Sequence, residues 1–130
     1  MTTTRQRLFE VTERYVMARS YTDADVAAAR ALRDTIRQRL DTVLTDDAVL
    51  CLPTTPAPAP LRGERTSARR GMRMRIGMLT CIAGTTGRPQ INLPLAAVGG
   101  LPVGLSLLGA RGADAVLLAF ARDLATGLAS

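Results

Sequence analysis

Apolar residues recur at helical spacing along the first third of the chain. This pattern predicts an amphipathic helix over residues 5–19, with an apolar stripe made of Leu8, Val11, Tyr15 and Ala18. A second helix is predicted over residues 23–43, where six apolar positions recur at intervals of three and four: Val26, Ala29, Leu32, Ile36, Leu40 and Val43. Thr22 and Asp25 have the spacing of a capping box before that helix. Residues 1–45 are therefore expected to form a helical hairpin.

The pattern changes from periodic to continuous in the middle of the chain. Ala48–Leu52 is a short, uninterrupted apolar run, which is typical of a buried strand. The stretch Pro53–Pro60 follows and is expected to end the strand, because proline has no amide hydrogen to donate. Residues 46–71 are thus predicted to be a strand and a long Pro/Arg-rich loop. Helical spacing returns between residues 72 and 82, where it predicts a short helix that ends before Gly84.

Two further apolar runs of strand length lie near the C-terminus. Residues 91–97 and 103–108 are separated by about five residues that include Gly99 and Gly100. A glycine-containing connection of that length fits an antiparallel hairpin, whereas a parallel pair requires a longer crossover. The pattern of residues 115–128 is helical again. Residues 72–130 are therefore predicted to form a helix, a strand hairpin and a helix.

These elements together predict an α/β fold. The chain is expected to be a single domain, residues 1–130, with a small mixed sheet of about three strands covered by helices. The strands are apolar on both faces, which is typical of a sheet that is covered on both sides. A sheet of three strands has unpaired edges, and these predict association with a second copy or with another chain.

Composition narrows the class of protein. Of the 130 residues, 47% are hydrophobic and only 3% are aromatic, which indicates a folded chain with an aliphatic core. Cys51 and Cys81 have no metal or redox spacing and are expected to be buried free thiols in a reducing cytosol. The N-terminus has no secretory h-region, and no apolar stretch is long enough to span a membrane. We expect a cytoplasmic chain without metal, cofactor or membrane.

The net charge of +6 comes largely from one segment. Residues 62–75 contain six Arg and one Glu. A nucleic-acid site would require interleaved aromatic residues or a recognisable binding fold, and the segment has neither. The segment is therefore expected to be a solvated loop and helix start, and no nucleic-acid partner is expected.

Two blocks of sequence resemble the C-terminal end of the amidase signature hydrolases. The first is DAVLCLPTTPAPAP at residues 47–60, and the second joins AGTTGRPQINLPL to GGLPVGLSLLGARGAD and an Ala/Leu helix. The resemblance covers roughly residues 14–128. The sequence departs from the family pattern at three positions. Arg88 stands where a small apolar residue is usual, Asn92 where Ser is common, and Ala113 where Ser often precedes the Asp.

The resemblance implies hydrolysis of carboxamide C–N bonds, but the family's catalytic Ser-Ser-Lys segment has no counterpart in this sequence. All 17 basic residues are Arg, and His is absent. The chain therefore has no evident proton acceptor near neutral pH to activate a hydroxyl or thiol. We expect no catalytic residue here, and interpret the chain as a C-terminal amidase fragment or subunit that requires a complementary N-terminal segment to act on a small amide. The alternative is a non-catalytic remnant or a partner-binding subunit.

Four threonines are candidate substrate-binding residues. Thr54 and Thr55 lie just beyond a strand end, where α/β proteins place ligand contacts. They could instead satisfy turn amides. Thr85 and Thr86 are candidates only through the resemblance, which implies that the connection containing them lies near the active-site cleft.

Overall fold

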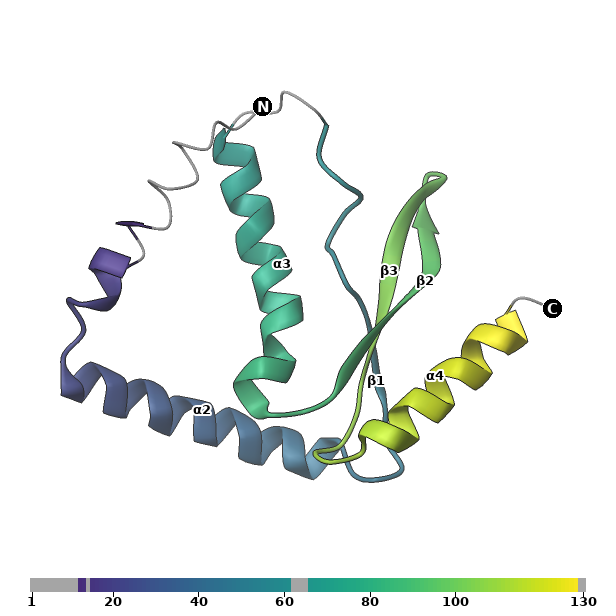
Figure 1. The fold of residues 1–130 in the computed structure, drawn as a ribbon, viewed down its shortest axis with the longest axis horizontal. Helices are drawn as coiled ribbons and strands as arrows, with labels where there is room; N and C mark the ends of the chain where they lie inside the picture. Colours follow the sequence, from purple (N-terminus) through teal and green to yellow (C-terminus); the bar gives the residue numbers. More distant parts are fainter. Residues whose placement is uncertain (1–11, 14, 62–65, 129–130) are drawn as a thin grey trace. The chain divides into compact units, whose positions relative to one another are not determined.

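A computed structural model describes residues 12–13, 15–61 and 66–128, apart from the side chains of residues 66–70 (Figure 1). The described elements are, in chain order, α2 (Asp23–Val43), β1 (Leu50–Pro53), α3 (Thr66–Thr86), β2 (Gln90–Val98), β3 (Leu101–Leu108) and α4 (Asp114–Leu128). They confirm the predicted α/β class. The helix predicted over residues 5–19 lies mostly outside the described residues, although residues 15–18 are helical.

The chain divides into two compact units, residues 1–35 and 36–130. The boundary falls within α2, which has the predicted bounds. Its predicted capping box is present: the Asp25 amide donates to the Thr22 hydroxyl, and the Asp25 carboxylate accepts from the Thr22 amide at 2.8 Å. Despite its apolar stripe, α2 contains no buried residue.

The sheet lies in the second unit and has the strand order β1-β3-β2. Both pairings are antiparallel, so the expectation of a mixed sheet is corrected. The physical reason is the position of β3. The β1–α3–β2 segment is a crossover whose two strands run in the same direction, but β3 lies between them and pairs antiparallel with each.

The predicted hairpin of β2 and β3 is confirmed. Gly99 and Gly100 form its turn with φ angles of 57° and 76°, a region that glycine enters without steric cost. The register shifts between Leu93 and Ala96. Pro94 lies within that irregularity, which fits its lack of an amide hydrogen and the position of β2 at a sheet edge.

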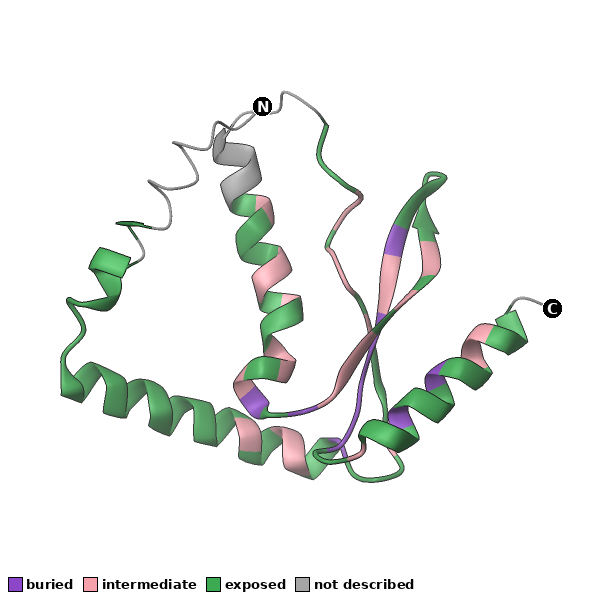
Figure 2. Cartoon of the chain, in the orientation of Figure 1, coloured by how far each residue is buried: buried purple, intermediate pink, exposed green. Residues whose placement is uncertain are grey.

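Helix α4 covers one face of the sheet. The buried residues Leu107, Leu117 and Ala121 form the core, and Ile91 and Leu93 pack against it together with Leu124. Figure 2 shows the buried positions of α4 on one side of the helix and the exposed positions on the other. We call this side of the sheet the α4 face.

Helix α3 is longer than the sequence predicts at both ends. It begins at Thr66, inside the expected loop of residues 46–71, and continues past Gly84 to Thr86. The Ala and Arg residues of its first turns are good helix formers, but their charge hides the apolar periodicity used to find the helix. Gly87, with a φ angle of 69°, ends it, and the Arg88 amide closes a Schellman bond of 3.2 Å to the Ala83 carbonyl.

Strand β1 is not the buried strand that its apolar run predicts. Leu50 is 38% exposed, and Cys51 is exposed as well. The reason is that the core beneath α4 is built on β2 and β3 and includes no residue of β1 among those described, so continuous apolarity did not correspond to burial. Cys81 is also free and exposed, on α3. The expectation of buried thiols is therefore wrong for both cysteines.

Candidate functional site

The polar side chains of the sheet meet where β1 ends. The Thr54 hydroxyl donates to Asn92 Oδ1 of β2, and Thr54 Oγ1 lies 2.8 Å from the Ser106 hydroxyl of β3. The register explains this meeting, because Ser106 pairs with Leu52 on one side and with Asn92 on the other. Successive strand side chains point to opposite faces, so these groups lie on the face opposite α4.

Gly104 gives this cluster its space. A Cβ atom on residue 104 would overlap Asn92 Oδ1 and would lie 2.7 Å from Thr54 Oγ1. Both approaches are closer than non-bonded atoms tolerate, so a side chain at this position would displace Asn92 or Thr54. The backbone is used as well, since the Thr54 amide donates to the Gly104 carbonyl at 2.8 Å. Contacts with β2 and β3 thus fix both the side chain and the main chain of Thr54.

A shallow, open cavity of about 400 Å³ adjoins this cluster. Its polar lining residues are Thr54, Thr55 and Asn92, and its apolar wall includes Met72 and Ile76 of α3, together with prolines and alanines of residues 57–60. We call this side of the sheet the cavity face. The Pro-rich stretch forms one rim, because residues 57–60 line the cavity. The Thr55 hydroxyl donates to the Ala57 carbonyl at 2.9 Å and so stabilises that rim.

The cavity shows no group that could activate a nucleophile. None of its lining residues is ionisable. Threonine hydroxyls need an adjacent base to attack a carbonyl carbon, and the sequence has neither Lys nor His to act as one. Within the described part of the chain, no group of three or more His, Cys, Asp or Glu residues could hold a metal ion. Hydroxyl and carboxamide groups beside an apolar wall suit a neutral ligand with few polar atoms.

The structure places the two pairs of candidate threonines differently. Thr54 and Thr55 both line the cavity. Thr85 and Thr86 lie in the last turn of α3 instead of in the expected irregular connection, and they are not among the cavity-lining residues. Thr86 is fully buried and donates to the Ile82 carbonyl at 2.7 Å.

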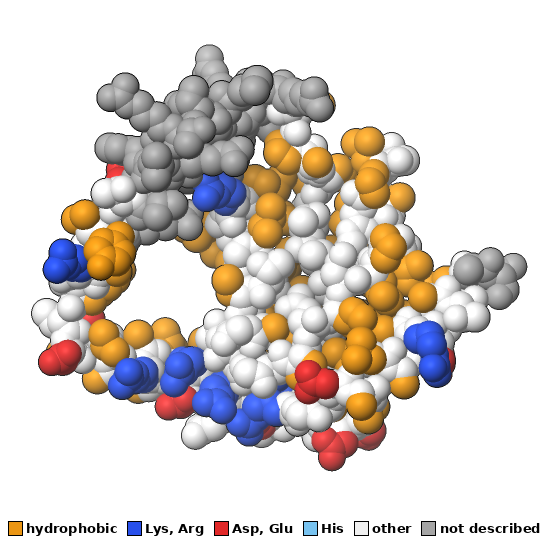
Figure 3. All heavy atoms as spheres, viewed as in Figure 1, with side chains coloured by type: hydrophobic (Ala, Val, Ile, Leu, Met, Phe, Trp, Pro, Cys, Tyr) orange, Lys and Arg blue, Asp and Glu red, His pale blue; other side chains and the backbone are white. Residues whose placement is uncertain are grey.

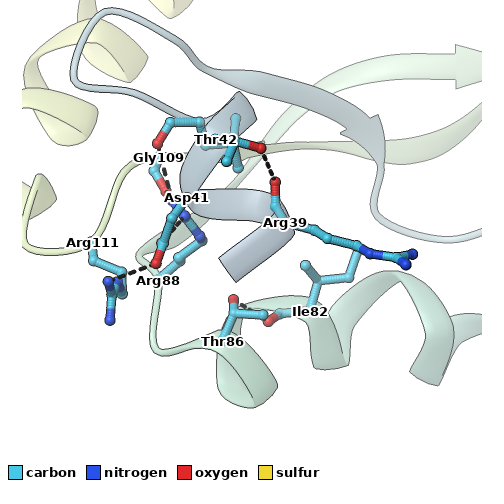
Figure 4. A network of polar contacts seen from close by, with 9 residues as sticks. Arg39, Asp41, Thr42, Ile82, Thr86, Arg88, Gly109 and Arg111 are labelled. Carbon is cyan, nitrogen blue, oxygen red and sulfur yellow. Dashed lines mark hydrogen bonds and ion pairs between the residues drawn. The ribbon is translucent and has the colours of Figure 1, made fainter. Parts of the chain in front are cut away.

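A second polar cluster surrounds Arg88 (Figure 4). The Arg88 guanidinium donates to the carbonyls of Leu44 and Gly109 at 3.3 and 3.2 Å, and it pairs with the Asp41 carboxylate. The other oxygen of Asp41 accepts from Arg111 at 2.7 Å. Arg88 has a side chain only 1% exposed, whereas Asp41 is 34% exposed. One carboxylate is therefore shared by a buried and an exposed cation.

The Arg88 cluster is a structural clamp. It joins the end of α2, the segment before β2 and the loop after β3. The last turn of α2 has no basic residue of its own, so Arg88 supplies the positive charge that favours a helix C-terminus. An arginine stays protonated in proteins and cannot serve as the missing base.

Sequence reasoning missed the other members of the cavity cluster. Asn92 stands out in the sequence only as a departure from a family pattern, as Arg88 of the second cluster does, and Ser106 and Gly104 were not predicted at all. A polar residue in the middle of each of two apolar strands is a usable signal, because a buried polar group requires a partner. Asn92 and Ser106 are directly opposite in the hairpin register, so the correct register would have brought them together.

Comparison with known proteins places this geometry in a class. A family model described as Amidase matches residues 2–118. A solved structure titled as an amidase superimposes with a TM-score of 0.69 at 29% identity, covering 86% of this chain and 27% of that one. The fold and the matched segment therefore define an amidase-type chain. This chain belongs to the amidase family.

Two relatives show what share of a family member's length this chain covers. It is 36% identical over 95 residues to Amidase 1 of Oryza sativa subsp. japonica, which is 73% of this chain and 22% of that protein. Over 95 residues it is also 36% identical to a glutamyl-tRNA(Gln) amidotransferase subunit of Geobacillus thermodenitrificans (strain NG80-2), again 73% of this chain but 19% of that protein. The chain thus spans about a fifth of each, which is consistent with the predicted C-terminal portion.

Proposed function

We propose that this chain is the C-terminal wall of an amidase that hydrolyses carboxamide C–N bonds, and that it acts with a complementary N-terminal segment. The cavity face supplies the substrate-side surface, with Thr54 and Thr55 as substrate-binding residues. The nucleophilic Ser, the second Ser and the Lys base come from the complementary segment. A small neutral carboxamide is the proposed substrate.

One observation supports this proposal most strongly. The three polar lining residues of the cavity, Thr54, Thr55 and Asn92, lie in the two sequence blocks that resemble the amidase signature family, and yet the chain has no Lys and no His. A surface that can hold an amide is present without a base that can activate a nucleophile. Such a surface can contribute to catalysis only beside groups from elsewhere.

Hydrolysis of a panel of simple carboxamides tests the proposal. The chain is assayed alone, then with a second polypeptide that contains the Lys and Gly/Ser-rich segment. That polypeptide comes from the reading frame upstream of this chain's gene or from the unmatched part of the rice relative. We expect ammonia release only from the mixture. Release by the chain alone would contradict the proposal, because it would require a base that the sequence lacks.

Variants of the mixture separate the two threonine pairs. Thr54→Ala and Thr55→Ala are expected to raise KM, since both residues line the cavity. Thr85→Ala and Thr86→Ala test the candidates at the end of α3. Thr80→Ala is the matched control, because Thr80 is exposed and its hydroxyl donates to the Ile76 carbonyl within the same helix.

A second function, partner binding without catalysis, is favoured by the exposed apolar side chains. On α2, Leu32 and Val43 are 62% and 66% exposed, and on the outer side of α4, Val116 and Leu118 are 63% and 58% exposed. Figure 3 shows hydrophobic side chains along both helices. Exposed apolar surface of this kind marks interaction sites, and the free sheet edges add unpaired backbone groups.

Gel filtration with a hydrophobic dye distinguishes this second function. A homo-oligomer or a complex with the complementary segment is expected, and the complex should bind less dye than the chain alone. A compact monomer that binds no dye would contradict it.

No membrane or nucleic-acid partner is part of the proposal. Among the described residues, none of the helices is both long and apolar enough to cross a membrane. The Arg-rich segment at residues 62–75 lies partly outside the described residues. The alternative that this segment is a basic module that binds nucleic acid is tested by the salt dependence of nucleic-acid binding. Nucleic-acid affinity that falls steeply with salt would support that alternative. A cytoplasmic location is proposed from the two free cysteines.

A further inference from the structure

The Asn92 carboxamide is held at its oxygen end by two hydroxyl groups. Asn92 Oδ1 accepts from Thr54, and Thr54 Oγ1 lies 2.8 Å from Ser106 Oγ. A hydroxyl has one proton, and that of Thr54 is used by Asn92. Ser106 therefore donates to Thr54, which gives a directed series of hydrogen bonds from Ser106 through Thr54 to Asn92.

This series leaves the nitrogen end of the carboxamide free. With Oδ1 bound in the cluster, Nδ2 points away from Thr54. Asn92 is exposed and lines the cavity, and within the described part of the chain its Nδ2 has no hydrogen-bond partner. A carboxamide nitrogen carries two N–H donors and accepts nothing. This cavity-lining side chain thus has an unused donor whose natural partner is an oxygen acceptor.

The orientation depends on Gly104. Asn92 Oδ1 occupies the space that a Cβ of residue 104 would take. The close approach of side chain to backbone limits rotation of the carboxamide, because the neighbouring atoms leave little room. The donor is therefore preorganised before a ligand arrives, which reduces the entropy lost on binding.

The other residues that line the cavity favour a ligand that is uncharged and aliphatic. Met72 and Ile76 contribute to the apolar lining of the cavity, and no lining residue carries a charge. An ammonium or carboxylate group would lose hydration there without gaining an opposite charge. An aliphatic chain would instead lose contact with water against apolar side chains.

We infer that Asn92 is a specificity-determining residue, whose Nδ2 donates to the carbonyl oxygen of a neutral ligand with an aliphatic chain packed along Met72 and Ile76. This inference rests on the proposed function, because an aliphatic carboxamide has both features. It also gives a role to a departure from the family pattern. The shorter Ser that is common at this position has no carboxamide donor to offer to the ligand.

The composition of the chain makes a direct test available. Asn92 is the only asparagine in the sequence. Labelling the full chain with ¹⁵N-asparagine therefore gives one labelled side-chain carboxamide in the NMR spectrum. The chain is titrated with hexanamide, with acetamide, which keeps the carboxamide but lacks the aliphatic chain, and with hexylammonium, which replaces the carboxamide by a charge.

Hexanamide is expected to shift the Asn92 side-chain signals in a saturable manner, at lower concentration than acetamide, and hexylammonium is expected not to shift them. Calorimetry then compares variants. Asn92→Ser should weaken hexanamide binding about threefold to tenfold, the loss expected for one neutral hydrogen bond. Gln90→Ser is the matched control, because Gln90 has a carboxamide on the same strand but does not line the cavity. It should leave the affinity unchanged.

Two results would overturn the inference: absence of saturable hexanamide binding by the unaltered chain, or equal affinity of the chain and its Asn92→Ser variant. Neither depends on hydrolysis, so binding is separable from the proposed function. Hexanamide binding without activity in any reconstituted mixture would refute the amidase proposal and support the inference about Asn92. Activity that does not respond to Asn92→Ser would refute the inference and support the amidase proposal.

Discussion

The two faces of the sheet differ in what covers them. On the α4 face, apolar side chains of α4, β2 and β3 pack together around Leu107, which is fully buried. On the cavity face, two hydroxyls and a carboxamide occupy the equivalent positions beside an open cavity. One strand contributes to both, since Leu107 and its neighbour Ser106 point to opposite faces. The α4 face therefore determines stability, and the cavity face is the surface available for a ligand.

Leu107→Ala gives the largest expected effect. Removing a fully buried leucine side chain leaves a cavity in the core and should lower the free energy of unfolding by about 2–5 kcal/mol. Urea denaturation measures the change. Leu101→Ala is the control on the same strand, because Leu101 is 54% exposed, and its effect should stay within about 0.5 kcal/mol. Similar losses for both variants would contradict the larger contribution that is assigned to the buried core around Leu107.

The Arg88 clamp should give the next largest effect. Asp41→Ala removes the only carboxylate that pairs with Arg88 in the described structure and leaves a buried cation, which should lower the free energy of unfolding by about 3 kcal/mol. Asp123→Ala is the control, because its pair with Arg122 is exposed, and it should cost at most about 0.5 kcal/mol. Equal urea midpoints for the two variants would show that the clamp is not structural.

The cavity cluster should show a smaller effect on stability. Ser106→Ala removes a buried hydroxyl that donates to Thr54, and a loss of about 1 kcal/mol is expected. A double-mutant cycle with Thr54→Val sharpens the comparison. Because the two hydroxyls share one hydrogen bond, their effects should not be additive, whereas Ser106→Ala and Thr22→Val, which lies in the other compact unit, should add. Additivity of the first pair would mean that the hydroxyls do not interact.

The smallest expected effect concerns the cap of α2 and its pH dependence. Hydrogen bonds from the Thr22 hydroxyl and amide lower the pKa of Asp25 below 3.8. Because the pKa of Asp25 is lower in the folded chain than in the unfolded chain, the cap stabilises the helix at pH values above the unfolded-state pKa. This stabilisation is lost as the pH falls through the folded-state pKa. Circular dichroism between about pH 6 and about pH 2 should therefore show helix lost only at the acid end. Thr22→Val should reduce that loss, and an unchanged acid transition would contradict the role of the cap.

Local patterns predicted much of this fold. The bounds of α2 and its cap followed from periodicity and the Thr22/Asp25 spacing, and the hairpin followed from two apolar runs around Gly99 and Gly100. These features depend on neighbours in the sequence, where turn and cap chemistry act directly.

Features that depend on partners far apart in the sequence were not predictable in this way. An apolar run gave the position of β1 but could not show that it is an edge strand with exposed residues. The buried position of Arg88 depends on carbonyls 44 and 21 residues away, at Leu44 and Gly109. The site was found in part: Thr54 was identified from its place beyond a strand, but its partner on β3, Ser106, became visible only once the register was known.

The amidase activity of the reconstituted mixture, measured as kcat/KM for hexanamide, tests most directly whether the cavity face is the functional face. The comparison is between Thr54→Ala, on the cavity face, and Thr80→Ala, on the exposed side of α3. We predict a loss of about tenfold for Thr54→Ala, because the hydroxyl that orients Asn92 is gone, and a change within about twofold for Thr80→Ala. Equal activity of the two variants, or activity of this chain without a complementary segment, would contradict this assignment.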